Sequence, residues 1–309
     1  MKRKSKAIQG LAVALATPFT DDGTVDEAGF RRLVRHVVAG GADVLVVLGS
    51  TGEAATLEED ERDLLIRATL EEANGRTVVA GTGHNATRKT CAWTARAREL
   101  GCDGALIVTP YYNKPMPSGL AEHFRAAAKA APGLPIVAYN VPGRTGTNLT
   151  PAALALLWEI DQVVAVKESS GNLAQIGEIA RALPRGKTLL AGDDHLAVPS
   201  MAVGAEGLVS VLANALPAET KRLVDAARAG RRDEARKLHA ELLPVIDALF
   251  CESNPIPLKA ALAIQGLAGD TLRLPLTRPE PATHRRVAEA LRPFARGAAP
   301  LVRNGKSGA

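Results

Sequence analysis

Residues 11–53 read LAVALATPFTDDGTVDEAGFRRLVRHVVAGGADVLVVLGSTGE, and they contain one complete repeat of the pattern that decides the fold. An apolar run, Leu11–Ala16, precedes a helical pattern whose apolar positions, from Phe30 to Val38, lie on one face. Gly40-Gly41 then supplies a left-handed stop, and a second apolar run, Val44–Leu48, follows. The order of strand, helix and strand predicts a parallel pair of strands joined by a helix.

The same order recurs along most of the chain. Eight apolar runs are found, at Leu11–Ala16, Val44–Leu48, Thr77–Ala80, Ala105–Val108, Ile136–Tyr139, Val163–Val166, Thr188–Ala191 and Leu208–Leu212. They are continuous rather than alternating, which indicates strands that are covered on both faces. Eight strands over about 230 residues favour a closed (β/α)8 TIM barrel of the α/β class over an open doubly wound sheet.

No strand pattern follows Gly230, and the remaining apolar periodicity is helical. The helical patterns lie at Arg232–Phe250, Ile256–Ile264 and Glu280–Leu291. We expect three parts: a catalytic barrel domain at 1–230, an appended C-terminal helical region at 231–295 and a flexible tail at 296–309.

The composition argues against several classes of protein. The formal charge of +5 comes largely from the two ends, where basic residues are not interleaved with aromatics, so we expect no nucleic-acid partner. Residues 7–17 form neither a signal peptide nor a membrane span, which favours a cytoplasmic protein without a membrane partner. The three cysteines, Cys91, Cys102 and Cys251, have no CxxC spacing and are expected to be reduced thiols.

Reacting groups in such barrels lie at the C-terminal ends of the strands. Polar residues follow five of the runs, in the segments Gly49-Ser50-Thr51-Gly52-Glu53, Thr109-Pro110-Tyr111-Tyr112, Tyr139-Asn140-Val141-Pro142-Gly143-Arg144, Lys167-Glu168-Ser169 and Gly192-Asp193-Asp194. If Val163 and Ala165 face the barrel axis, strand alternation predicts that Lys167 does too. The same argument places Tyr139 with Val137, and Ser50 with Val46 and Leu48, so three reactive side chains are expected to converge.

Lys167 is the candidate nucleophile. A lysine amine attacks a carbonyl only when it is neutral, and an apolar barrel mouth favours the neutral form because burial penalises the ammonium. An ion pair with Glu168 is the competing interpretation, which strand alternation disfavours because adjacent residues point to opposite faces.

The neighbouring polar residues suggest a proton relay and a carboxylate clamp. The hydroxyls of Tyr139, Ser50 and Tyr112 could pass protons to and from a carbonyl oxygen, although buried tyrosines often only pack. Arg144 could bind a carboxylate through its bidentate fork, or lie as a surface arginine in a loop.

Phosphate and metal chemistry have weaker support. Residues 81–87, GTGHNAT, match neither the dinucleotide fingerprint nor the P-loop spacing, so they indicate a tight turn. Asp193-Asp194-His195 could contribute to a metal site, but no HxH or HExxH spacing accompanies it. We expect no metal and no cofactor.

From about Gln9 to Pro275 the chain resembles the dihydrodipicolinate synthase and N-acetylneuraminate lyase superfamily of class I aldolases. The segments that support the resemblance occur in order: Leu15–Phe19, Gly49–Glu53, Val108–Pro115, Tyr139–Gly146, Val166–Glu168, Gly192–Asp194 and Glu252–Pro257. The resemblance implies that Lys167 forms an imine with pyruvate, that Tyr139 shuttles protons and that Ser50 and Tyr112 complete the relay.

The resemblance also implies how the substrates and subunits are arranged. Thr51 and the backbone around Val209 would hold the pyruvate carboxylate, with Gly192 as a further substrate-binding position. Tyr112 would reach into the neighbouring subunit's site, which requires a homo-oligomer, and the family usually forms tetramers. No cofactor is implied, because the protonated imine is the electron sink.

Arg144 favours the synthase branch, which uses an arginine in this turn for the carboxylate of L-aspartate 4-semialdehyde. The implied reaction is condensation of that aldehyde with pyruvate to 4-hydroxy-tetrahydrodipicolinate, in lysine and diaminopimelate biosynthesis. Ser50 departs from the threonine usual in synthases and keeps the hydroxyl. A retro-aldol lyase for another 2-oxo acid, such as a sialic acid or sugar-derived keto acid, and a non-catalytic keto-acid-binding barrel remain alternatives.

Lysine-inhibited members of the family are similar to this chain at Asn85 and Tyr111. Where those members hold the effector with histidines and an acid, this sequence has Glu59, Arg62 and Lys89. Because Lys89 would repel the ammonium of lysine, we expect weak or absent feedback by lysine.

Overall fold

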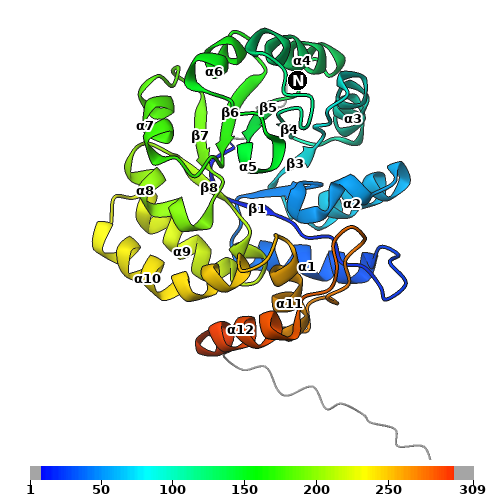
Figure 1. The fold of residues 1–309 in the computed structure, drawn as a ribbon, viewed down its shortest axis with the longest axis vertical. Helices are drawn as coiled ribbons and strands as arrows, with labels where there is room; N and C mark the ends of the chain where they lie inside the picture. The colour runs from blue at the N-terminus through cyan, green and yellow to red at the C-terminus, as the bar shows by residue number, and fades with distance from the viewer. Residues whose placement is uncertain (1–7, 296–309) are drawn as a thin grey trace, which may run out of the picture.

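The computed structural model describes residues 8–295, which form a closed barrel of eight parallel strands (Figure 1). The strands are β1 Gly10–Ala14, β2 Val44–Val47, β3 Thr77–Gly81, β4 Gly104–Val108, β5 Ile136–Asn140, β6 Val163–Glu168, β7 Thr188–Ala191 and β8 Gly207–Ser210. Strands that are consecutive in sequence pair in the sheet, and β8 pairs with β1 to close it. The predicted (β/α)8 barrel is therefore confirmed, and each predicted run ends within two residues of an observed strand end.

Helices lie between the strands, and all but the short α5, which lies at the barrel mouth, cover the outside of the barrel (Figure 1). They are α1 Glu27–Ala39, α2 Glu59–Glu72, α3 Thr87–Leu100, α4 Pro117–Ala130, α5 Pro142–Thr145, α6 Pro151–Trp158, α7 Leu173–Arg181, α8 Ala197–Ala202 and α9 Pro217–Arg228. The apolar face of α1 is fully buried at Phe30, Leu33, Val34 and Val37, as its periodicity predicts. Most of the buried hydrophobic residues form this outer layer between strands and helices.

The inside of the barrel has its own packed layer of small and branched side chains. It includes Ala12, Val46, Val79, Leu106, Val137, Ala165, Leu190 and Val209. The prediction that Val163 also faces inward is wrong, since Val163 belongs to the outer layer. Val164 is an extra residue in β6, because Ile136 pairs with Val163 whereas Val137 pairs with Ala165. This bulge resets the alternation, so that Ala165 and Lys167 face the barrel axis.

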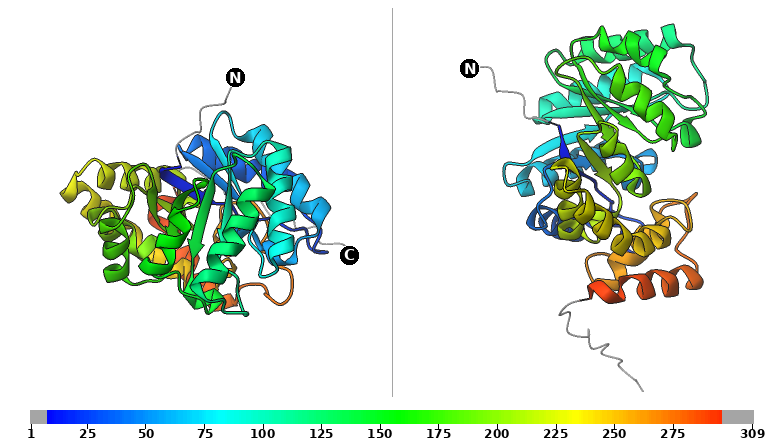
Figure 2. Two further views of the ribbon diagram at one scale, coloured as in Figure 1. Left: turned by 90° about the horizontal axis from the view of Figure 1, so that it is seen from above. Right: turned by 90° about the vertical axis from the view of Figure 1, so that its left-hand side faces the viewer.

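Three α-helices follow the barrel within residues 8–295, as predicted. They are α10 Arg232–Leu249, α11 Ile256–Ile264 and α12 Pro281–Leu291. Both figures place α12 at the end of the molecule opposite α4 and α6 (Figures 1 and 2). The predicted flexible tail at 296–309 and the basic segment Met1–Lys6 lie outside the described residues.

None of the helices within residues 8–295 is both long enough and apolar enough to span a bilayer.

Candidate active site

Lys167 lies at the C-terminal end of β6, with its side chain inside the barrel mouth. Only 5% of the residue is exposed, and its Nζ is 4.1 Å from the centre of the Tyr139 ring. The two residues are cross-strand neighbours, because Tyr139 on β5 is in register with Lys167 on β6. The structure thus brings together the first two residues that the sequence predicts for the site.

The competing ion pair between Lys167 and Glu168 does not form. Glu168 is buried on the other face of β6, where it accepts hydrogen bonds from Asn140 Nδ2 at 2.9 Å and from the backbone N–H of Ser170 at 2.7 Å. A third bond comes from Gln175 Nε2 at 3.4 Å. Lys167 therefore faces the barrel mouth without a carboxylate from its own strand.

The phenol of Tyr139 is more acidic than an ordinary tyrosine. Burial alone would raise the pKa of Tyr139, but this effect is outweighed by the charge of Lys167, a hydrogen bond with Ser50 and the charge of Arg144, with Ser169 contributing further. The net result is a lowered pKa for Tyr139. A phenol with a lowered pKa beside an amine is suited to receive and return a proton.

Ser50 reaches Tyr139 by a different route from the predicted one. Leu48 does not continue the alternation of β2: it has a φ of 61° and packs in the outer layer. Its carbonyl oxygen lies so close to Gly81 that a Cβ there would be 1.9 Å from it, which requires glycine. A 3-10 turn, Ser50–Gly52, then follows and carries the Ser50 hydroxyl to the phenol of Tyr139.

Thr51 is buried in the same turn, and its hydroxyl is held by the C-terminal region. Asn254 Nδ2 donates to Thr51 Oγ1 at 2.9 Å. Arg144, on α5, donates from Nη2 to the carbonyl oxygen of Asn254 at 2.9 Å. Three segments that are far apart in the sequence therefore meet at the barrel mouth.

A cavity of about 560 Å³ lies at the barrel mouth beside these residues. Its wall includes Ser50, Tyr139, Arg144, Asn254 and Arg273, together with His84, Lys89 and Tyr111. Lys167 is not among the wall residues, and it adjoins the cavity through its contact with the Tyr139 ring. The volume is large enough for two small organic acids.

Gly192 directly follows β7, and Val209 lies on β8, at the side of the barrel next to β6. A Cβ at Gly192 would lie 1.9 Å from Ser169 Oγ and 2.9 Å from Lys167 Cε, so glycine leaves the room that both side chains occupy. The side chain of Val209 packs in the barrel interior on β8.

Tyr112 is not brought to the other relay residues within one chain. It is 89% exposed, with a φ of 70°, and its backbone N–H donates to the carbonyl oxygen of Thr145 at 3.2 Å. A tyrosine held in left-handed backbone and pointing into solvent is an unusual surface feature.

The acidic cluster after β7 is structural in this fold. Asp194 is fully buried and accepts hydrogen bonds from Ser210 Oγ and from the N–H of Val211 at 2.9 Å. His195 contacts Asp193 and, at 3.0 Å, Asp247 of α10. Within residues 8–295 no three His, Cys, Asp or Glu side chains gather as metal ligands would.

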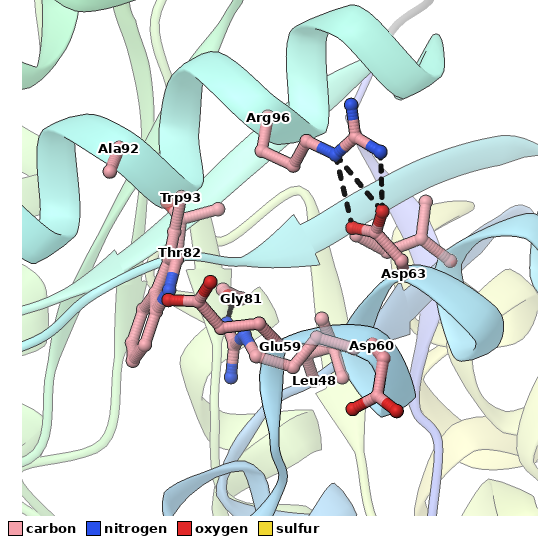
Figure 3. Close-up of a pocket in the computed structure, with 11 residues that line it drawn as sticks. Leu48, Glu59, Asp60, Asp63, Gly81, Thr82, Ala92, Trp93 and Arg96 are labelled. Carbon is pink, nitrogen blue, oxygen red and sulfur yellow. Dashed lines mark hydrogen bonds and ion pairs between the residues drawn. The ribbon is translucent and has the colours of Figure 1, made fainter.

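A second cavity, of about 290 Å³, lies between α2 and α3 (Figure 3). Two of its charged groups form an ion pair, Arg96 with Asp63, and Arg62 donates to the carbonyl oxygen of Gly81 at 2.7 Å. The Arg62 guanidinium also stacks 3.9 Å from the ring centre of Trp93, and burial lowers the pKa of Arg62 to about 10.

Sequence reasoning assigned no role to a buried ion pair beside the site. Glu53 ends the turn that carries Ser50 and Thr51, and its carboxylate binds the ammonium of Lys259 on α11. Both side chains are almost fully buried, and Lys259 Nζ also donates to the carbonyl oxygen of Thr271 at 2.7 Å. Glu53 is the last residue of the segment Gly49–Glu53, but only the fold shows that its partner is Lys259, 206 positions further along the chain.

The closed barrel, with a buried lysine at a strand end and an acidified tyrosine in contact with it, defines the class: a barrel of the class I aldolase type. The chain belongs to the dihydrodipicolinate synthetase family, whose sequence profile matches residues 7–293. This finding confirms the resemblance inferred from the motifs.

Individual relatives and solved structures support the assignment to this family. The 4-hydroxy-tetrahydrodipicolinate synthase of Geotalea daltonii is 47% identical over 269 residues, which cover 87% of this chain and 92% of that one. The crystal structure of dihydrodipicolinate synthase from Aquifex aeolicus superposes with a TM-score of 0.90 at 41% identity, covering 93% of this chain and 98% of that one.

A further similar structure bears on assembly. It is described as the first monomeric dihydrodipicolinate synthase variant, and it matches with a TM-score of 0.89 at 37% identity, covering 92% of this chain and 96% of that one. Similarity to the family therefore does not by itself give the oligomeric state of this chain.

Proposed function

We propose that this chain condenses pyruvate with L-aspartate 4-semialdehyde to 4-hydroxy-tetrahydrodipicolinate through an imine on Lys167. The observation that most supports this proposal is the position of Lys167, buried at the end of β6 with Nζ 4.1 Å from the ring centre of Tyr139. The names of the relatives support the choice of substrates.

The first half of the reaction forms the imine. The neutral Lys167 amine attacks C2 of pyruvate, and the C2 oxygen takes up a proton to give a carbinolamine. That hydroxyl then leaves as water while the nitrogen lone pair forms the C=N bond. Tyr139 moves the protons in both steps, because its lowered pKa makes it a better proton donor than an ordinary tyrosine.

The second half forms the carbon–carbon bond. Loss of a proton from C3 converts the imine to an enamine, whose C3 attacks the aldehyde carbon of the acceptor. The acceptor's amine then attacks C2 and displaces Lys167 as the ring closes. Arg144 would hold the acceptor's carboxylate at the cavity wall, and Thr51, Gly192 and the backbone at Val209 would hold pyruvate.

Tyr112 extends this proposal to the assembly. Its exposure and left-handed backbone are consistent with a side chain that enters a neighbouring subunit and completes that subunit's relay with Ser50. We therefore propose a homo-oligomer, at least a dimer and by analogy with the family a tetramer. Sedimentation of the purified chain tests this: a monomer with full activity would contradict it.

The experiment that tests the function is a product assay with pyruvate and L-aspartate 4-semialdehyde. The proposal predicts the heterocyclic product with this acceptor, and little cleavage of sialic acids or sugar-derived keto acids. Retro-aldol cleavage of such acids without condensation would favour the lyase alternative, and a chain that binds pyruvate without turnover would favour the non-catalytic one.

A further inference from the structure

Ser169 directly follows β6, where backbone hydrogen bonds join the chain to the segments on either side of it, at the ends of β5 and β7. Its N–H donates to the carbonyl oxygen of Asn140 at 2.8 Å, which continues the pairing of β5 with β6. On the other side, the N–H of Gly192 donates to the carbonyl oxygen of Glu168 at 2.8 Å. Because Ser169 is two residues beyond Lys167, strand alternation sends both side chains to the same face.

The Ser169 hydroxyl lies beside the reacting groups. The Cβ position built on Gly192 is 1.9 Å from Ser169 Oγ and 2.9 Å from Lys167 Cε, so the hydroxyl and the lysine side chain border the same small space. The hydroxyl also lies near enough to the Tyr139 phenol to help lower the pKa of Tyr139.

No hydrogen bond of regular geometry reaches this hydroxyl among the described residues, although its oxygen is inaccessible to solvent and lies close to the Tyr139 phenol. Leaving a buried hydroxyl without a well-formed hydrogen bond is unfavourable, so its presence beside a reactive lysine indicates a partner that arrives with the substrate. Neighbouring Ser170 differs, because its Oγ accepts from the N–H of Asn172 at 3.2 Å in the following loop.

We propose that Ser169 is a further catalytic residue, whose hydroxyl donates a hydrogen bond to the C2 oxygen of pyruvate as Lys167 attacks. In that step the N–C bond forms, the C=O π electrons move to oxygen, and the new oxyanion accepts a hydrogen bond from Ser169 Oγ. Tyr139 then moves one proton from the attacking nitrogen to this oxygen, which gives the carbinolamine, and supplies its own phenolic proton as the hydroxyl departs as water and the protonated imine forms. Ser169 keeps its own proton throughout and acts by stabilising the developing charge.

This inference rests on the proposed imine chemistry, and one experiment separates the two. The full-length chain, Ser169→Ala and the matched control Ser170→Ala are mixed with pyruvate, reduced with borohydride at a series of times, and analysed by intact mass. The parent chain and Ser170→Ala are expected to form the adduct at the same rate. Ser169→Ala is expected to form the same adduct roughly tenfold to a hundredfold more slowly, as for loss of a hydrogen bond to a charged oxygen.

Each other outcome has a definite meaning. If the parent is trapped and Ser169→Ala is trapped equally fast, Ser169 is not catalytic, whereas the imine proposal stands. If the parent is not trapped, both proposals fail. If Ser169→Ala is poorly folded by circular dichroism, Ser169→Thr decides instead: it keeps a hydroxyl and is expected to retain most of the trapping rate, and equally slow trapping in a folded threonine variant would overturn the inference.

Discussion

Replacing Lys259 by methionine should destabilise the protein strongly, because it leaves the buried carboxylate of Glu53 without its counterion. Lys259 Nζ binds that carboxylate, donates to the carbonyl oxygen of Thr271 at 2.7 Å and lies 4.1 Å from the ring centre of Phe19. Methionine has a similar length and keeps the packing on Phe19, so the main loss is electrostatic. After the change, Glu53 retains the N–H of Arg273 at 3.1 Å.

Removing one partner of a buried ion pair costs about 3–5 kcal/mol in the free energy of unfolding. For a chain of this size, about 2 °C of melting temperature accompanies each kcal/mol, so Lys259→Met should melt roughly 6–10 °C lower. The control is Lys221→Met, because Lys221 pairs with Asp225 along one helix near the surface, where a pair contributes about 0–1 kcal/mol.

Urea denaturation and a double-mutant cycle measure this loss. Glu53→Gln alone should also destabilise, because it leaves the buried ammonium of Lys259 without a carboxylate. The combined Glu53→Gln and Lys259→Met variant should lose less than the sum of the two single variants, by about 1–3 kcal/mol. A Lys259→Met variant within about 1 kcal/mol of the parent would refute the argument that this pair holds the turn of Ser50 and Thr51 to the C-terminal helices.

Three further predictions concern the site itself. In an absorbance titration, one of the chain's three tyrosines should ionise below pH 10, because the folded state lowers the pKa of Tyr139. In Lys167→Met this ionisation should move to higher pH, because the charge of Lys167 is the largest of the effects that lower the pKa of Tyr139. In Tyr139→Phe the ionisation should be absent. A tyrosine titration unchanged by Lys167→Met would show that the lysine's charge does not act on the phenol. Arg144→Ala should raise the KM for a carboxylate-bearing acceptor roughly tenfold to a hundredfold and leave the trapping of pyruvate unchanged, and an equal loss of trapping would mean that Arg144 serves the first substrate instead. Sub-millimolar lysine should leave turnover unchanged, because Lys89 lies in the wall of the large cavity and repels a second ammonium; clear inhibition would contradict this.

The barrel could be predicted from sequence because each strand and helix has a local apolar pattern that identifies it. The apolar runs are continuous, the α1 face has helical periodicity, and the helices that follow Gly230 begin and end almost where their patterns do. The prediction that Lys167 faces the barrel mouth is also correct, although Val163, from which the alternation was counted, faces outward. The bulge at Val164 changes which residues of β6 face inward, and nothing in a run of valines reveals an extra residue.

The parts of the site that depend on distant segments could not be predicted. Asn254 donates to Thr51 across 203 positions of sequence, and Lys259 reaches Glu53 across a similar span, so only the packing of α11 beside the barrel brings them together. Ser169 was visible as the residue two positions after Lys167. Its importance depends on the burial of its hydroxyl without a regular hydrogen bond to any residue within 8–295, which only the side-chain geometry reveals.

The most direct test of the account is to reduce the purified chain with borohydride in the presence of pyruvate and to map the modified peptide. The account predicts one reduced pyruvyl adduct per chain, located on Lys167, and no adduct in Lys167→Met. Lys259 serves as an internal comparison, because it is also buried, with its pKa lowered to about 8 mainly by burial, but is bound by Glu53. An adduct on Lys259, or no adduct at all under conditions in which product forms, would contradict the central claim.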